Sequence, residues 1–119
     1  MNAAELARAM LDAKAECDAA HAWHEECVEE AARAEHAYRL AKATAILGVS
    51  GTVQEREAHM DQATADLRYK AQLYAGRERS ALEKVKTTRQ VLSMWQSLAA
   101  SNRAEAELAK WTPREVESA

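Results

Sequence analysis

Residues 48–52 read GVSGT, and this short stretch decides how the chain folds. Two of its five residues are glycine, whereas the long stretch before it holds no glycine or proline at all. Gly48 is expected to take the left-handed conformation that commonly follows the end of a helix. Thr52 and Glu55 have the spacing of a capping box, which starts a helix. The sequence therefore predicts one turn here, with a long helix on each side.

The helix predicted before the turn, at about residues 2–47, carries a stripe of apolar residues at alternating steps of four and three. Eleven of the twelve stripe positions are apolar when cysteine is counted, and His24 is the exception. This spacing is typical of helices that pair in coiled coils. The stripe consists of Leu6, Met10, Ala13, Cys17, Ala20, His24, Cys27, Ala31, Ala34, Tyr38, Ala41 and Ala45.

The helix predicted after the turn, at about residues 53–100, has a similar stripe. Ala63, Leu67 and Ala71 follow one another at steps of four, which predicts a stutter that locally unwinds a supercoil. The whole stripe reads Met60, Ala63, Leu67, Ala71, Tyr74, Glu78, Ala81, Val85, Thr88, Leu92, Trp95 and Ala99. Residues 101–119 are expected to form a separate short helical extension, partly frayed, with a new helix start at Thr112–Pro113.

Two arms of similar length joined by a short turn predict an all-α fold, a coiled-coil-like antiparallel hairpin over residues 1–100. Residues should then face each other where their numbers add up to about 100, which places Trp23 near Gly76. The charges favour this pairing, because residues 1–37 carry nine acidic and three basic groups whereas residues 68–89 carry seven basic and two acidic groups.

The composition indicates a core built from small side chains. The chain has 28 alanines and only 17 leucines, isoleucines and valines, and its net charge is -3. More than half of its residues are Ala, Glu, Lys, Leu or Arg, as in long helices and coiled coils. No apolar run is long enough to span a bilayer, and no signal peptide is evident. We therefore expect a cytoplasmic protein with reduced cysteines and no membrane partner.

Residues 16–27, ECDAAHAWHEEC, gather both cysteines and two of the four histidines. Cys17 with His21, and His24 with Cys27, have spacings that can chelate a metal ion from a helix. These four residues nevertheless span about 15 Å of one straight helix, so they cannot surround one tetrahedral ion. A metal would have to be shared between subunits. We therefore predict that Cys17, His24 and Cys27 belong to a packed stripe, and that the protein has no cofactor and no metal.

Catalytic motifs are missing elsewhere in the sequence. We find no phosphate-binding glycine-rich loop, nucleophile elbow or zinc-peptidase motif, and acidic residues around the cysteines disfavour a reactive thiolate. The protein is therefore not expected to be an enzyme, and a metal-binding or redox role is the third-ranked function.

The basic stretch 68–89 is the best indication of nucleic-acid binding. Basic residues interleaved with Tyr69 and Tyr74 could contact phosphates and stack on bases. The alternative is that these charges pair with the acidic first helix. The candidate contacts are Arg68, Lys70, Arg77, Arg79, Lys84, Lys86 and Arg89.

Seven large aliphatic residues fall outside the two stripes and are expected to form a second apolar face. Burying that face would favour dimerisation into a four-helix bundle, or binding of another protein. The predicted interface residues are Leu11, Val28, Leu40, Leu73, Leu82, Val91 and Leu98.

The stretch from Ala37 to Tyr69 resembles a pattern in small, mostly uncharacterised tailed-phage proteins. The pattern has an alanine-rich helix that leads through Gly51-Thr52-Val53 into Glu55-Arg56-Glu57-Ala58. Such proteins are often encoded near replication and recombination genes. The resemblance implies an accessory protein in the host bacterial cytoplasm that binds an unidentified host or phage protein. A non-enzymatic, homodimeric adaptor or modulator is the first expectation, and a DNA-binding accessory protein using residues 68–89 is the alternative.

Overall fold

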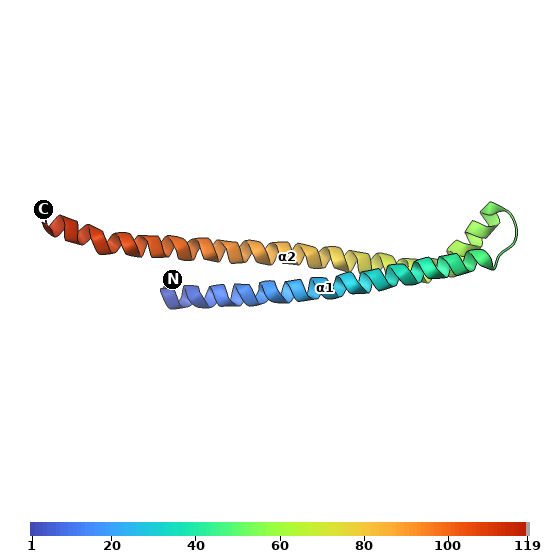
Figure 1. Ribbon diagram of the computed structural model, residues 1–119, viewed down its shortest axis with the longest axis horizontal. Helices are drawn as coiled ribbons and strands as arrows, with labels where there is room; N and C mark the ends of the chain where they lie inside the picture. The colour runs from blue at the N-terminus through green and yellow to red at the C-terminus, as the bar shows by residue number, and fades with distance from the viewer. Residues whose placement is uncertain (119) are drawn as a thin grey trace. The chain divides into compact units, whose positions relative to one another are not determined.

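The chain forms two long helices, α1 (Ala3–Leu47) and α2 (Val53–Ser118). The computed structural model describes the backbone of residues 1–118 and the side chains of residues 1–111. Within that part there is no strand, so the predicted all-α class is confirmed. The helices divide into two compact units: unit 1 comprises Met1–Ala20 with Val85–Ala119, and unit 2 comprises His21–Lys84. In each unit a segment of α1 lies antiparallel to a segment of α2 (Figure 1).

The turn in unit 2 confirms the predicted capping box. The Glu55 backbone N–H donates to Thr52 Oγ1 at 3.2 Å, and the Thr52 N–H donates to Glu55 Oε2 at 3.4 Å. The left-handed glycine, however, is Gly51, with φ 128°, and not Gly48 as the sequence predicted. Gly48 instead continues the helical direction, because its N–H donates to the Ala45 carbonyl at 3.3 Å. The turn itself occupies residues 48–52 as predicted, because α1 ends at Leu47 and α2 begins at Val53.

Unit 1 begins with a second capping box. The Glu5 N–H donates to Asn2 Oδ1 at 2.8 Å, and the Asn2 N–H donates to Glu5 Oε2 at 3.3 Å. Together they provide partners for two backbone donors at the helix terminus. The first turn of α1 is thereby capped.

The α1 stripe is buried as predicted. All seven buried residues of α1 belong to the stripe, and its other five positions are half-buried. Alanine and cysteine make up six of the seven buried residues, so the two helices pack through small side chains. The buried members are Leu6, Ala13, Cys17, Ala20, Cys27, Ala31 and Ala34.

The α2 stripe differs from the prediction at one position. Thr64 is 3% exposed, whereas the predicted Ala63 is exposed. Thr64 can be buried because its hydroxyl donates to the Met60 carbonyl at 2.7 Å, which satisfies its hydrogen-bonding need. With Thr64 in place, steps of four and three alternate without interruption from Met60 to Ala99. The predicted stutter is therefore absent.

The register of the two stripes is also shifted from the prediction. Each stripe has twelve positions, and the two sets have the same spacing. Every α1 position faces an α2 position when the two residue numbers add up to 105, as for Ala34 and Ala71 in unit 2. The predicted sum was about 100. The shift arises because the first residues of α2, 53–59, are all exposed and do not pack in the stripe. The predicted placement of Trp23 near Gly76 does not fit a sum of 105, and a Cβ at Gly76 would meet only Arg79 Nη2.

Helix α2 passes through Ser101–Asn102 and Thr112–Pro113 without interruption, contrary to the expected break and new helix start. Serine and asparagine have only modestly unfavourable helix propensities, so they do not end a long helix by themselves. Residues 101–111 are all exposed. The side chains of residues 112–118 and all of Ala119, on which the expectation of fraying depends, lie outside the described residues.

Candidate functional site

The structure does not group the four candidate metal ligands around one point. Cys17 lies in unit 1, while His21, His24 and Cys27 lie in unit 2. Both cysteines are buried, reduced members of the stripe, and both histidines are half-buried. Among the described residues, no group of three or more His, Cys, Asp or Glu side chains is arranged to hold a metal ion.

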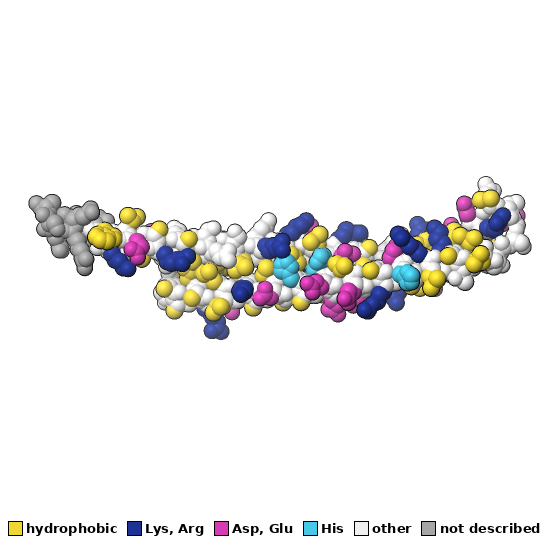
Figure 2. Space-filling model, in the orientation of Figure 1, with side chains coloured by type: hydrophobic (Ala, Val, Ile, Leu, Met, Phe, Trp, Pro, Cys, Tyr) yellow, Lys and Arg dark blue, Asp and Glu magenta, His cyan; other side chains and the backbone are white. Residues whose placement is uncertain are grey.

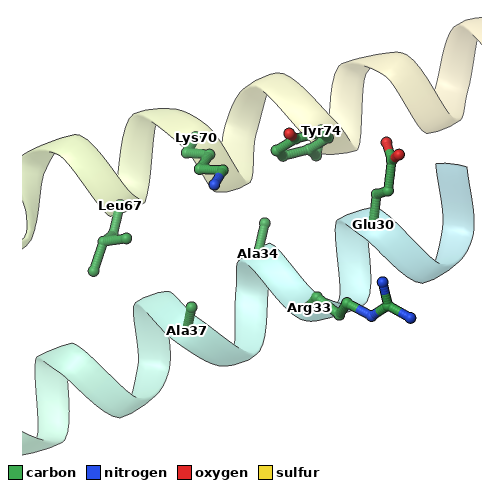
Figure 3. A pocket seen from close by; sticks show the side chains of 7 residues that line it. All are labelled: Glu30, Arg33, Ala34, Ala37, Leu67, Lys70 and Tyr74. Atoms are coloured by element: carbon green, nitrogen blue, oxygen red, sulfur yellow. The ribbon is translucent and has the colours of Figure 1, made fainter.

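A cleft of about 310 Å³ opens between the helices of unit 2, beside Tyr74. The ring of Tyr74 has Lys70 Nζ 5.7 Å and Arg77 Cζ 5.4 Å from its centroid, within the range of cation–π attraction. Glu30 extends from α1 toward α2 in Figure 3. We call this the Tyr74 cleft. Its full lining is Glu30, Arg33, Ala34, Ala37, Leu67, Lys70 and Tyr74.

Arg77 links the two helices at this cleft. Its Nη1 lies 3.5 Å from Glu30 Oε2, an oxygen that is shielded from water and accepts no hydrogen bond. The side chains are 48% and 32% exposed, so the pair is only partly screened. Arg77 therefore already has a carboxylate partner and an aromatic partner inside the protein, which reduces its availability for phosphate.

The seven candidate nucleic-acid contacts are all exposed but do not share one side of α2. In unit 2, Lys70 and Arg77 are seven residues apart and lie on the Tyr74 cleft side. Arg68 and Arg79 are each two residues away from one of these, about 200° around the helix. They therefore point to the opposite side. Lys84 is also in unit 2, and Lys86 and Arg89 are in unit 1.

The seven candidate interface residues are all exposed, by between 37% and 66%. They are Leu11 66%, Val28 39%, Leu40 61%, Leu73 51%, Leu82 39%, Val91 37% and Leu98 47%.

These seven residues do not form one apolar face in either unit. In unit 2, Leu40 and Leu73 lie on the Tyr74 cleft side, because they are a heptad from Arg33 and one turn from Lys70. Val28 and Leu82 occupy heptad positions on the other flank of their stripes, so they lie on the opposite side. In unit 1, Val91 and Leu98 share one side and Leu11 lies on the other. One interface therefore cannot cover the whole set.

The regular stripe of α2 reveals a further exposed residue that the sequence reasoning missed. Met94 is 55% exposed and lies between Val91 and Leu98 at steps of three and four. The spacing was the available signal, but the predicted interface set contained only leucine and valine. Figure 2 shows hydrophobic and charged side chains interspersed on the viewed face, without a large patch of one sign.

Neither helix, over the described residues, has a segment apolar and long enough to cross a membrane. Comparisons with protein-family models, curated proteins and solved structures find no match to this chain.

Proposed function

We propose that this protein is a non-enzymatic helical adaptor or modulator that self-associates and binds another protein. The supporting observation is the set of seven large aliphatic side chains that remain 37–66% exposed. Alanine and cysteine fill most of the buried positions, while these larger residues remain in contact with water. Covering them with another chain would remove apolar area worth about 25 cal/mol per Å².

The setting that we propose is phage DNA replication or recombination in the cytoplasm of a host bacterium. Its support is the sequence resemblance of Ala37–Tyr69 to small tailed-phage proteins. The partner would be a host or phage protein of that machinery, and the adaptor would act by occupying or joining surfaces. Self-association through a homodimer, as in a four-helix bundle, would cover one of the two sides on which the exposed residues lie.

The second candidate function is DNA binding as an accessory protein. One observation favours it: Tyr69 is 68% exposed between Arg68 and Lys70, in position to stack on a base. The engagement of Arg77 by Glu30 and Tyr74 favours the adaptor function instead.

Mass measurement and DNA titration test the proposal together. Size exclusion with light scattering should give about twice the 13.2 kDa monomer mass. A strict monomer at high micromolar concentration would contradict self-association. DNA binding near micromolar affinity at physiological salt, lost in the folded Arg77→Ala/Arg79→Ala variant, would establish the second candidate instead. The adaptor function predicts no such binding.

A further inference from the structure

Two clefts in unit 1 define two chemically different sides of its helix pair. One cleft, of about 250 Å³, is lined by Leu98, Ser101 and Glu105, together with Met1, Leu6 and Asn102. The other, of about 270 Å³, is lined by Ala7 and Arg103, together with Ala3, Leu6, Met10, Ala99 and Asn102. Leu6 and Asn102 line both clefts because they belong to the boundary between the helices. We call the two sides the Leu98 side and the Arg103 side.

Among the described side chains of α2 in this unit, five large apolar residues are exposed, and all but Trp111 lie on the Leu98 side. Val91 is one heptad before Leu98, and Met94 and Leu108 are each one heptad from Ser101. At 3.5 residues per turn, the four apolar residues lie within about 50° around the helix. Their exposed fractions are Val91 37%, Met94 55%, Leu98 47% and Leu108 68%. Val91, Met94 and Leu98 are spaced at i, i+3 and i+7, which is spacing at which a second helix makes contacts.

The charges of the Leu98 side are acidic. Ala7 lines the cleft of the Arg103 side, so its heptad position on α1 faces that side. Glu16 lies at the heptad position on the other flank of the α1 stripe, so it belongs to the Leu98 side. Glu5 and Asp12 are each within one turn of that flank, and Glu105 lines the cleft itself. Arg8 is exposed on the outer surface of α1, and its Nε lies 3.6 Å from Asp12 Oδ1.

The Arg103 side of the same unit has the opposite character. The heptad positions of Ala7 and Arg103 place Lys14 and Arg89 on this side, and Lys86 lies one turn from Arg89. Its acidic residues are Asp18 and Glu107, the latter 3.3 Å from Lys110 Nζ through its Oε1, and its exposed aliphatic residue is Leu11. The exposed apolar row of unit 1 therefore lies on the side where carboxylates gather, away from most of the basic residues.

We propose that the Leu98 side of unit 1 is the docking surface for a basic amphipathic helix of a partner protein. This inference rests on the protein-binding function proposed above and names the chemistry of its partner. Apolar residues of the partner helix, at steps of three and four, would pack over Val91, Met94 and Leu98. Lysine and arginine flanking them would face Glu16 and Glu105. Helix-in-groove recognition of this kind uses apolar anchors for affinity and surrounding charges for specificity.

The acidic residues determine which kinds of molecule can bind the Leu98 side. Nucleic acid and anionic membranes carry phosphates, which these carboxylates would repel. An acidic helix would be repelled for the same reason. A second copy of this chain could present the basic part of α2 in unit 2, where Leu73 accompanies Lys70 and Arg77, so the test must separate it from a partner helix.

The experiment is a titration of the full chain with two synthetic helical peptides, followed by fluorescence anisotropy. Both peptides carry leucine at heptad spacing, and their remaining positions are mainly lysine and arginine in one and mainly glutamate in the other. The basic peptide should bind at least about tenfold more tightly than the acidic peptide. The Met94→Asn/Leu98→Asn variant, which removes the apolar anchors without adding charge, should weaken basic-peptide binding at least about tenfold, whereas Leu73→Asn in unit 2 should not change it.

A second variant protects the test against misfolding. Glu16→Lys/Glu105→Lys changes exposed residues only, so helicity by circular dichroism should match the wild type. This variant should lose the preference for the basic peptide. Equal binding of both peptides, or equal sensitivity to Leu73→Asn, would overturn the proposed partner chemistry.

The molecular mass of each variant shows whether a second copy of this chain covers the Leu98 side. If Met94→Asn/Leu98→Asn converts a wild-type dimer into a monomer, a second copy covers this side and the basic-helix proposal is wrong, while self-association stands. If the dimer persists and basic-peptide binding is lost, the proposal is supported. If the wild type is a monomer and binds neither peptide, the proposed adaptor function fails together with this inference.

Discussion

In α1 the buried stripe residues are mostly small, whereas the exposed aliphatic residues are large. Inside, Ala13, Ala20 and Cys27 are between 1% and 5% exposed, whereas Leu11 and Leu40 are 66% and 61% exposed. The difference teaches that heptad position, and not side-chain size, decides burial in this chain. Small residues let the helices approach closely, and the larger ones remain outside the intramolecular contact.

The largest expected effect comes from placing a large residue inside the stripe. Ala81 is 0% exposed, so Ala81→Leu should lower the free energy of unfolding by about 3 kcal/mol through overpacking. Ala65→Leu, on the exposed surface of the same helix, should change it by less than about 0.5 kcal/mol. Urea unfolding followed by circular dichroism measures both. Similar values for the two variants would break the distinction between the regions.

A matched pair of valines in unit 1 tests the opposite change. Val85 is 3% exposed and Val91 is 37% exposed. Val85→Ala should cost about 2 kcal/mol, from two lost methyl groups and the cavity they leave, and Val91→Ala less than about 0.5 kcal/mol. Thermal unfolding at a fixed protein concentration compares the two variants. An equal loss at Val91 would mean that this residue supports the fold and not a partner.

The ion pair beside Tyr74 should contribute less to the free energy of unfolding than either of the stripe residues Ala81 and Val85. Arg77→Ala removes the contact with Glu30 and one cation beside the Tyr74 ring. Because the pair is partly exposed, the expected loss is about 0.2–1 kcal/mol, and it should shrink in high salt. Unfolding at two salt concentrations measures it, with Arg68→Ala as the control. A loss that is large and insensitive to salt would contradict this account.

The smallest effect is expected at Thr64, the polar residue inside the α2 stripe. Thr64→Val keeps the shape but removes the hydroxyl that donates to the Met60 carbonyl. The lost hydrogen bond and the relieved cost of burying a hydroxyl should nearly cancel, within about 0.5 kcal/mol. Chemical unfolding of this variant beside Ala63→Val decides the matter. A loss above about 1.5 kcal/mol would show that the hydroxyl contributes to the fold.

The sequence predicted the stripe positions well because spacing carries that information. It placed all twelve α1 positions correctly, since apolar residues mark the period without ambiguity. Thr64 escaped prediction because its polarity concealed its burial, which depends on a local hydrogen bond to Met60. The capping box at Thr52 and Glu55 was predicted because its two partners are only three residues apart.

The register and the sides of the helices were harder to predict. Counting from the turn assumed that α2 packs from its first residue, but residues 53–59 are exposed and displace the pairing. Grouping Leu11 with Leu98 as one face assumed that residues outside the stripe share a direction. Their sides depend on which flank of each helix borders its neighbour, and the clefts beside Ala7 and Leu98 supplied that information.

The register determines which residues are inside, so a cysteine cross-link in unit 2 tests the central claim most directly. In a Cys17→Ala/Cys27→Ala background, Ala34→Cys with Ala71→Cys should form a disulfide rapidly on mild oxidation, because both positions are buried at matching stripe positions. Ala34→Cys with Asp66→Cys, which fits the register of 100, should stay reduced. Gel mobility without reductant distinguishes the two. Faster cross-linking of the second pair than of the first would contradict the account.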